Sequence, residues 1–424
     1  MEHLQLEDFR NYTRAAIGLS DGVNLVVGRN AQGKTNLLEA IHHLGGLGSP
    51  RAADAALVRD GAERALLHAT VVRGAGSAGP QSKRGAGSAG PQDQPGAGSA
   101  GPQDQPGAGS AGGQRKIAVD MEIRPGRGTR ALVNKTPVVG ARALATLTVS
   151  VFFGPDELSL VKGSPEGRRR FLDDLAVKLR PARDGARREW ERVLKQRNAL
   201  LKSAPRGKTA LPTLEVWDEA LCRTGASLSA ARLEVLGTLL PYAVKRYEEI
   251  AGAGGLDLAW SSSWLDADYG ELALRDPGAV EEGVLADMLR RALEEVRAKE
   301  LERGLSLVGP QRDDVSVLLR AGGGSGASML EARVYASQGD QRTVALALKL
   351  AEHDLLAETL GEEPVLLLDD VFSELDPQRR GWLADAVRSM GQTILSSAEP
   401  GVADATRADL VVSVSEGRLE SIGG

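Results

Sequence analysis

The chain has 424 residues, of which 42% are hydrophobic and 26% charged, and its formal net charge is −5. This length and apolar content allow two or three compact units and exclude a disordered protein, while the negative charge excludes a general attraction to nucleic acid. The single cysteine, Cys222, excludes internal disulfides; because there is neither a basic-then-apolar N-terminal leader nor an apolar run of membrane-spanning length, we expect a soluble cytoplasmic protein with no membrane partner.

A phosphate-binding turn lies between a predicted strand and a predicted helix near the N-terminus. The short apolar run at 24–27 predicts a buried strand, and the spacing of apolar residues after Leu37 predicts a helix. Between them, "GRNAQGKT" fits the P-loop pattern, in which backbone N–H groups and the helix N-terminus surround the oxygens of a polyphosphate. In that pattern Lys34 reaches the outer phosphates and Thr35 places its hydroxyl on Mg²⁺, so ATP and Mg²⁺ are the expected ligands. The residues expected to contact the nucleotide here are Gly28, Arg29, Asn30, Ala31, Gln32, Gly33, Lys34, Thr35 and Asn36.

Repeats of eleven residues, such as "RGAGSAGPQDQ", occupy positions 73–116. They contain only small, polar, glycine and proline residues, so they cannot bury enough surface to offset the entropy of ordering them. We predict a disordered surface insertion. The runs at 65–72 and 116–123 are strand-like, which predicts a hairpin with an expanded loop. Repeat expansion in a tolerant loop explains this segment as well as a partner-binding role does.

Secondary-structure patterns divide the chain into three parts. Strand patterns dominate up to "TLTVSVFF" at 146–153, helical periodicity dominates from about 168 to 299, and alternating strands and helices return from about 305. The simplest architecture is a discontinuous nucleotide-binding domain with a helical subdomain inserted in its middle. The expected boundaries are 1–165 and 301–424 for the two parts of the ATPase lobe and 166–300 for the helical subdomain.

Two adjacent carboxylates end a predicted buried strand in the last part of the chain. The apolar run from Val365 to Leu368 carries Asp369 to the C-terminal tip of that strand, where P-loop ATPases need a carboxylate to hold the Mg²⁺ shell. Asp370 follows, placed to accept a proton from the attacking water as a general base. Alone, such a pair fits a strand end that caps a turn equally well. Beside a P-loop it predicts the catalytic half of an ATPase site, formed by Lys34, Asp369 and Asp370.

The segment "YASQGDQR" at 335–342 opens a long apolar-striped helix. Ser337 and Gly339 fall at its N-terminus, where free N–H groups and the helix dipole favour an anion, although an ordinary N-cap with a glycine turn fits the same residues. The order of P-loop, Ser-x-Gly-x-Gln and a strand ending in two acids resembles that of the ABC class of ATPases. In that class the Ser-Gly helix of one subunit closes on phosphates bound by another. We therefore expect an α/β fold, a discontinuous ABC-type P-loop ATPase head with an inserted, mainly helical lid subdomain.

Five segments in order make the chain resemble the RecF family of bacterial recombination and repair ATPases, which have ABC/SMC-type heads. The resemblance covers nearly the whole chain apart from the repeats, and five ordered matches are far more specific than any one of them. The segments are "LEDFRNY" at 6–12, "FFGPDELSLVKGSPEGRRRFLD" at 152–173, "LVGPQRDDV" at 307–315, "YASQGDQR" at 335–342 and "LLLDDVFSELD" at 366–376.

The resemblance implies roles for particular residues. It assigns Thr35 and Asp369 to Mg²⁺ and Asp370 to the base, and it implies a weak, DNA-stimulated ATPase that forms an ATP-dependent homodimer. The residues implied to meet the nucleotide or interface of the second subunit are Ser337, Gly339, Gln341, Arg342 and, in "SELD", Asp376.

Two positions depart from the family pattern. Gln311 stands where many relatives have histidine, and Asp340 stands where a second glutamine is common in the signature. Asp340 adds a negative charge beside a proposed phosphate contact, which would weaken engagement in trans. We find no clear glutamine loop or switch histidine, and "LSSAEP" at 395–400 occupies the region where the latter would fall.

A local excess of positive charge lies in the helical segment. Residues 168–208 contain fourteen Lys or Arg against five Asp or Glu, an excess of nine. Such a block can neutralise several phosphates, giving binding that depends on salt and is largely indifferent to sequence. The same charges fit a solvated helical face, and those at 168–170 fit ion pairs within the protein. We expect DNA contact through part of 183–202 and expect Trp190, on the apolar stripe, to belong to the core.

The resemblance implies an ATP-gated clamp. ATP joins two heads, the dimer holds DNA at single-strand gaps, single-strand/duplex junctions or duplex, and slow hydrolysis releases it, assisting RecO and RecR in loading RecA. Three alternatives share parts of the pattern. A transport ATPase predicts a membrane partner and a tighter "LSGGQ"-like signature, and the helical insert and the segment "PDELSLVKGSPEGRRRFLD" speak against it. An SMC-type structural head needs hundreds of heptad residues between its two halves, and the insert here is too short and too broken by proline and glycine. A scaffold without turnover stays open because Asp370, in place of a glutamate base, has a shorter reach.

Overall fold

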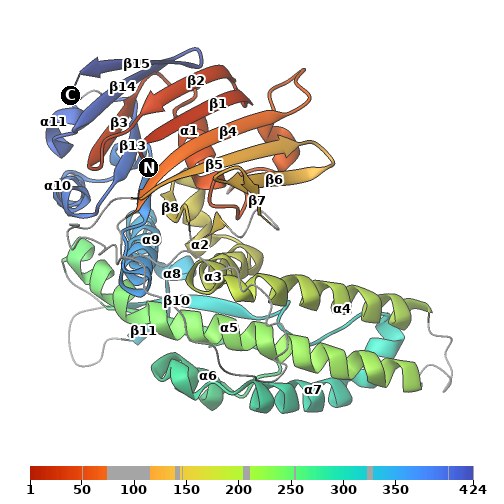
Figure 1. The fold of residues 1–424 in the computed structure, drawn as a ribbon. Coiled ribbons are helices and arrows are strands. Elements are labelled where there is room, and N and C mark those ends of the chain that lie inside the picture. Colours follow the sequence, from red (N-terminus) through yellow and green to blue (C-terminus); the bar gives the residue numbers. More distant parts are fainter. Residues whose placement is uncertain are drawn as a thin grey trace, which may run out of the picture.

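The computed structural model describes residues 1–49, 51–73, 115–138, 144–145, 147–203, 211–252, 255–321, 328–399 and 401–423. The repeat insertion expected to be disordered lies outside these residues except at its two ends. Two six-stranded sheets lie together at one end of the molecule and a group of long helices lies at the other (Figure 1). Among the described residues, no helix is both long and apolar enough to cross a lipid bilayer.

The first sheet is mainly parallel and carries the P-loop strand near its middle. Its strand order is β15-β14-β3-β13-β12-β8, and only the β14–β15 pair is antiparallel. Strands β3, β13 and β12 are buried along almost their whole length, as expected for parallel strands covered on both faces. The strands are β3 (Val23–Val27), β8 (Ser150–Phe153), β12 (Val365–Asp369), β13 (Thr393–Ser397), β14 (Leu410–Ser415) and β15 (Arg418–Gly423).

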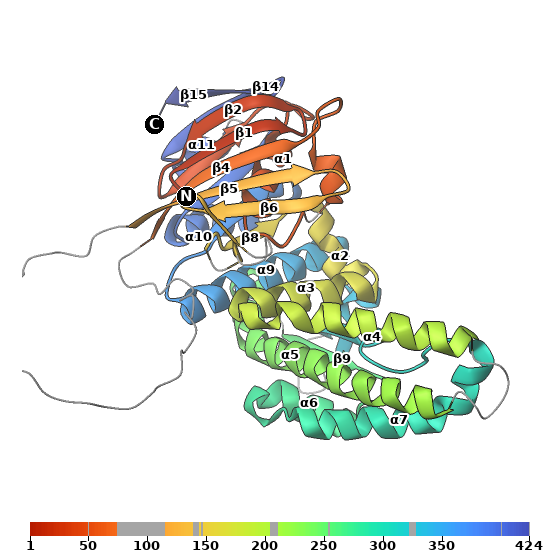
Figure 2. The same cartoon turned by 45° about the vertical axis from the view of Figure 1, so that its right-hand side comes forward.

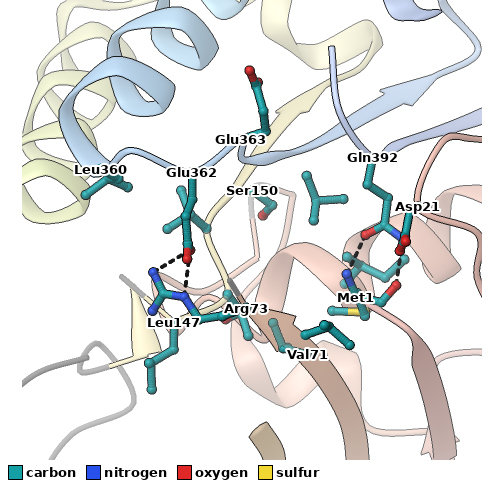
Figure 3. A pocket seen from close by; sticks show the side chains of 15 residues that line it. Met1, Asp21, Val71, Arg73, Leu147, Ser150, Leu360, Glu362, Glu363 and Gln392 are labelled. Carbon is teal, nitrogen blue, oxygen red and sulfur yellow. Dashed lines mark hydrogen bonds and ion pairs between the residues drawn. The ribbon is translucent and has the colours of Figure 1, made fainter. Parts of the chain in front are cut away.

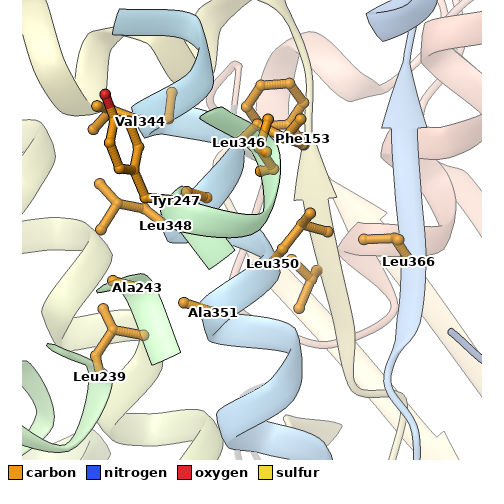
Figure 4. Close-up of a cluster of buried hydrophobic side chains, with 14 of the residues drawn as sticks. Phe153, Leu239, Ala243, Tyr247, Val344, Leu346, Leu348, Leu350, Ala351 and Leu366 are labelled. Atoms are coloured by element: carbon orange, nitrogen blue, oxygen red, sulfur yellow. The ribbon is translucent and has the colours of Figure 1, made fainter. Parts of the chain in front are cut away.

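Helices cover both faces of this parallel sheet. Because strand side chains alternate in direction, Leu366 and Leu368 of β12 join one core while Leu367 joins another. The first core contains the helix α9 (Gln338–Leu360), and Figure 4 shows Leu350 of this helix on the side that faces Leu366. The second core contains the P-loop helix α1 (Lys34–His43), which lies between the two large sheets.

The second large sheet is antiparallel, in the order β2-β1-β4-β5-β6-β7. Strands β4 and β5 are the two arms of the hairpin expected around the repeats, and their pairing runs to Arg73 opposite Arg115. Alternate residues of these strands pack on α1, while the others face outward. The strands are β1 (His3–Phe9), β2 (Tyr12–Gly18), β4 (Ala65–Arg73), β5 (Arg115–Arg124), β6 (Gly128–Val133) and β7 (Thr136–Pro137).

Long helices pack side by side in the middle segment of the chain (Figure 2). The longest, α5, packs against α4 and α7 and also against α9 of the ATPase lobe. Trp190 of α4 is buried in the core of this helical part, as expected. The helices are α3 (Pro165–Leu179), α4 (Asp184–Ser203), α5 (Leu211–Ala251), α6 (Ala267–Arg275) and α7 (Glu282–Arg303), with shorter helices α2 (Ser159–Lys162), α8 (Ala332–Tyr335), α10 (Pro377–Ala386) and α11 (Val402–Thr406) elsewhere.

A small three-stranded sheet includes one strand, β9, that was not expected, because the sequence predicts a mainly helical segment there. It has the order β11-β10-β9 and is antiparallel throughout. Strand β9 (Leu256–Ser261) follows α5 and pairs with β10 (Asp314–Ala321), which pairs in turn with β11 (Ser328–Glu331). The sequence pattern did not predict β9, because β9 is held in place by β10, which lies more than fifty residues further along the chain.

Candidate functional site

The P-loop leaves the C-terminal end of β3 and enters α1 through a turn that requires glycine. Gly33 has φ +118°, and a Cβ there would lie 2.6 Å from the Asn11 side chain. A Cβ at Gly28 would lie 2.5 Å from the carbonyl oxygen of Val414. The Tyr12 hydroxyl donates a buried hydrogen bond of 2.9 Å to the carbonyl of Gly33. The two large sheets therefore fix the shape of the loop from both sides.

Lys34 lies across this loop. Its Nζ donates to the carbonyl oxygens of Gly28 at 2.7 Å and Arg29 at 3.1 Å. Burial lowers the pKa of Lys34, while Asp370 and Asp369 raise it. The ammonium is thus held on the rim of the loop, within the field of both acids, and fits an anion placed in the loop.

Three elements meet at Asp369. The Thr35 hydroxyl at the start of α1 donates to Asp369 Oδ1 at 3.0 Å, and the Ser396 hydroxyl at the end of β13 donates to the same oxygen at 2.5 Å. The residues that the sequence assigns to Mg²⁺ are therefore neighbours. Among the described residues, no group of three or more His, Cys, Asp or Glu could hold a metal ion.

Asp370 occupies a left-handed backbone conformation, with φ 52°. Its N–H is held at the end of β13, 3.2 Å from the Ser396 carbonyl and 3.1 Å from the Ser396 hydroxyl. Its Oδ1 is buried and has no hydrogen-bond partner within the described residues. Burial raises the pKa of Asp370, Lys34 opposes that rise, and Asp369 and Glu399 add to it. A carboxylate with an unsatisfied oxygen beside the P-loop lysine can accept a proton from water.

The sequence did not assign Ser396 a function, although it singled out "LSSAEP" as the place of a missing switch residue. Ser396 contacts both acids, because its hydroxyl donates to Asp369 and accepts from the Asp370 N–H. Only the parallel pairing of β12 with β13 brings it there, with Asp369 opposite Ser396.

The signature residues are displayed at the start of α9. Ser337 caps this helix by accepting the N–H of Asp340 at 3.2 Å, and both Ser337 and Gly339 are exposed. Arg342 forms an ion pair with Glu374 at 3.2 Å. Gln341 points inward instead, donating to the Ala332 carbonyl at 3.0 Å.

Within the part of the chain that the structure describes, no hydrogen bond or ion pair joins 337–342 to the P-loop at 28–36; the signature meets other partners. Asp376 caps α10, where its Oδ1 accepts the N–H groups of Gln378 and Arg379 at 3.0 Å each. The Arg379 N–H is the main cause of the lowered pKa of Asp376. The signature and the P-loop are thus two separate surfaces of one chain.

A cavity of about 180 Å³ lies at the opposite edge of the parallel sheet (Figure 3). Its lining includes Asp21, Ser150, Val365 and Gln392, which lie at the amino-terminal ends of the parallel strands. Ligands of open α/β sheets bind beyond the carboxyl ends of the strands. The arrangement of Lys34, Asp369 and Asp370 follows that rule and this cavity does not.

Ion pairs within the protein neutralise many of the cations in the positive segment at 168–208. Arg168 forms a bidentate pair with Asp314 at 2.7 and 2.8 Å, and Arg183 pairs with Glu234. The fully buried Arg197 pairs with two acids, Asp218 and Glu300. Of the described cations on α4, three are exposed and have no ion-pair partner: Arg192, Lys195 and Lys202.

Comparison with known proteins gives consistent matches along the chain. A family model described as an AAA domain matches residues 3–52. The chain is 40% identical over 432 residues to the DNA replication and repair protein RecF of Streptomyces avermitilis, an alignment that covers 99% of each protein. It is 41% identical over 414 residues to the protein of the same name from Beutenbergia cavernae, covering 93% of this chain and 92% of the relative.

Solved structures agree with these relatives. The recombination mediator protein RecF with ATP, of the RecFOR pathway, superposes with a TM-score of 0.78 at 25% identity, covering 100% of this chain and 97% of that chain. An Smc head bound to the winged-helix domain of ScpA superposes with a TM-score of 0.52 at 14% identity, covering 100% and 97%. This second likeness concerns the fold alone. The expected α/β ABC-type head with a helical insertion is thereby confirmed.

Proposed function

The chain belongs to the RecF family of DNA replication and repair proteins, and from this premise we propose that it is an ATP-gated clamp on DNA. Two copies close head to head when the ATP on each P-loop is covered by the signature of the other copy. The closed dimer holds DNA near single-strand gaps or single-strand/duplex junctions, and slow hydrolysis releases it. ATP acts here as a ligand with higher affinity for the closed state.

The proposed nucleotide site uses the P-loop residues 28–36 and the two acids after β12. Lys34 contacts the outer phosphates, while Thr35 and Asp369 hold Mg²⁺, as their 3.0 Å contact supports. Bound Mg²⁺ supplies positive charge that offsets the negative charge of the phosphate oxygens. Asp370 takes the proton of the attacking water through its Oδ1, which has no hydrogen-bond partner among the described residues.

The observation that carries the dimer is the separation of the two halves of the site within one chain. Ser337 and Gly339 are exposed and make no hydrogen bond to the P-loop within the described part of the chain, so a second copy can reach them. In this proposal Arg342 and Asp376 line the same interface, and the inward-pointing Gln341 supports the start of α9 from within. Each composite site then takes its P-loop from one copy and its signature from the other.

DNA binding is proposed on the helical part, through the exposed cations of α4 that have no ion-pair partner among the described residues. Contacts to backbone phosphates bind single-strand and duplex DNA without sequence preference. We further propose a weak ATPase stimulated by DNA, and RecR, RecO and RecA as the partners of the loaded clamp. The division into an ATPase lobe at 1–165 and 301–424 and a helical subdomain at 166–300 is part of the same proposal.

A scaffold that binds ATP without turnover is the second candidate. It is favoured by the short reach of Asp370, whose backbone is fixed by Ser396 at the end of β13. The two candidates differ in one observable. A clamp with slow hydrolysis releases phosphate and then DNA, whereas the scaffold keeps both.

Light scattering of the full chain without nucleotide, with ATP and with ADP tests the proposal, each repeated with a gapped duplex. We expect a dimer with ATP alone, and DNA retained only in that state. A monomer under all six conditions would remove the clamp mechanism. Phosphate release measured in the same samples separates the clamp from the scaffold.

A further inference from the structure

The hydroxyl proton of the signature serine is already committed within the single chain. Ser337 Oγ donates to Asp340 Oδ2 at 2.7 Å. A serine hydroxyl has one proton to donate. A phosphate oxygen that accepts from Ser337 must therefore displace the Asp340 carboxylate.

The second oxygen of Asp340 is also engaged. Arg379 Nη2 lies 3.2 Å from Asp340 Oδ1, and Arg379 Nε lies 3.4 Å from Asp376 Oδ2. The Arg379 side chain is 21% exposed and that of Asp340 is 42% exposed. Arg379 Nη1 also lies 3.3 Å from where a Cβ of Gly339 would be. The guanidinium is thus packed directly against the signature turn.

This arrangement differs from ordinary helix capping. In a capping box the acid at the third helical position accepts the backbone N–H of the cap residue. In the described residues around α9, neither oxygen of Asp340 accepts the Ser337 N–H; one oxygen accepts from the Ser337 hydroxyl and the other from Arg379. The Asp340 carboxylate therefore acts on the side chain that is offered to the second copy.

We propose that Asp340 is a positioning residue that holds the Ser337 hydroxyl as an internal substitute for phosphate, with Arg379 as its counter-charge. The inference rests on the proposed ATP-dependent dimer and concerns the regulation of its composite site. When two copies close, the phosphate bound by one copy replaces Asp340 on Ser337 of the other. The displaced carboxylate stays paired with Arg379, which limits its repulsion of the phosphate. The pair thereby sets the ATP concentration at which the dimer forms.

The first test compares the natural chain with Asp340→Asn by light scattering across an ATP titration. Asparagine has the same shape but offers only a neutral hydrogen bond, which is roughly half as strong as a charge-assisted one. Because two sites close together, we expect the dimer Kd with ATP to fall about 10-fold or more. ATP binding to the monomer stays unchanged, because Asp340 does not contact the P-loop of its own chain. Asp287→Asn, which removes another exposed acid from an i,i+3 ion pair with Arg290, is the matched control and leaves the Kd unchanged.

The outcomes separate the inference from the function on which it rests. If the natural chain dimerises with ATP and Asp340→Asn has the same Kd, the inference is wrong and the proposed function stands. If neither chain dimerises at any ATP concentration, both are wrong. A dimer formed only by Asp340→Asn supports the inference, since it identifies Asp340 as the obstacle. If Asp287→Asn lowers the dimer Kd equally, the change comes from net charge alone and the inference is wrong.

A second arm tests the role of Arg379 through a double-mutant cycle. Arg379→Gln leaves Asp340 without its counter-charge, so we expect the dimer to weaken about 3-fold or more in the natural chain and little in the Asp340→Asn background. Arg379→Lys keeps the charge and restores most of the affinity. Equal effects of Arg379→Gln in both backgrounds would contradict the pairing.

Discussion

Asp370 combines two properties that an ordinary surface carboxylate lacks. Its Oδ1 is buried without a partner in the described structure, and its backbone is fixed by Ser396 in a left-handed conformation. Folding raises the pKa of Asp370, mainly through burial. The folded chain therefore keeps this proton to higher pH than the unfolded chain, and stability is lost as pH rises through that interval.

Replacing Asp370 by Asn separates chemistry from binding. We expect hydrolysis to fall about 10²- to 10⁴-fold, because the proton acceptor is absent, while ATP binding and dimerisation persist. The same variant melts at a higher temperature than the natural chain at neutral pH, and the difference shrinks toward pH 4, where the unfolded carboxyl also begins to take up its proton. Phosphate release and melting curves at pH 4 and pH 7.5 measure both effects. Undiminished hydrolysis would assign the base elsewhere.

A second acid should make stability depend on pH near neutrality. Asp313 is fully buried, accepts the Trp264 Nε1 at 2.9 Å, and has a second oxygen with no partner among the described residues. Burial raises the pKa of Asp313 to about 7. We expect the free energy of unfolding to fall between about pH 4 and pH 7, by at most about 4 kcal/mol, and Asp313→Asn to remove that fall. Urea denaturation at pH 5 and pH 8 measures it.

The neighbouring Asp314 supplies the control for that experiment. Its carboxylate forms the bidentate pair with the largely buried Arg168, so Asp314→Asn leaves a buried charge unpaired and destabilises the chain at pH 8. Because the two adjacent substitutions should change the free energy of unfolding at pH 8 in opposite directions, the comparison separates the environments of the two carboxylates. If the free energy of unfolding of the natural chain does not change with pH, the burial argument for Asp313 is wrong.

Sequence spacing predicted the residues that are close in the chain or share a motif. Lys34 and Thr35 follow from the P-loop, and Asp369 and Asp370 follow from the strand that carries them. Ser396 could not be found this way, since its contact with Asp369 depends on the register between β12 and β13. Arg379 was not predicted either, because it reaches Asp340 only through the packing of α10 near the start of α9.

At the level of elements, the strongest patterns were also the most local. The P-loop strand and helix and the long helix after the signature were evident from periodicity, and the structure has them as β3, α1 and α9. Strand β9 was missed because its partner, β10, is distant in sequence. The roles of the signature residues in a second copy stay a prediction, since a single chain holds only half of each proposed site.

The β4–β5 hairpin allows a prediction about the repeats. Its last pair, Arg73 and Arg115, brings the two strands together at the ends of the segment 74–114. Replacing 74–114 by Asn-Gly should close the hairpin with a two-residue turn, since this dipeptide favours the turn type that matches the strand twist. We expect no loss of thermal stability and unchanged ATP-dependent dimerisation. A lower melting temperature, or a failure to dimerise in this variant alone, would give the repeats a structural role.

The distribution of charge over the whole molecule decides where DNA can bind. A net charge of −5 repels a polyanion on average, so binding needs cations that are not already neutralised by the protein itself. Ion pairs remove Arg168, Arg183 and Arg197 from consideration. Among the described residues, α4 offers exposed cations without an ion-pair partner, and it lies on the side of the helical part nearer the sheets, with α7 on the far side (Figure 2).

Reversing the charge of Arg192, Lys195 and Lys202 together should weaken DNA binding by the closed dimer and flatten its salt dependence. Removal of one cation from a DNA phosphate lowers the slope of log K against log salt by about 0.9 on duplex DNA, so the slope reports how many of these cations touch the backbone. The matched control reverses Arg291 and Lys299, two exposed cations of α7, which lies on the far side of α5 from α4 (Figure 1). Dimerisation without DNA stays unchanged in both variants, because neither set touches the P-loop or the signature. Equal slopes in the α4 variant and the natural chain would place the DNA on another surface, whereas a slope that falls in both variants would show only that net charge governs the encounter.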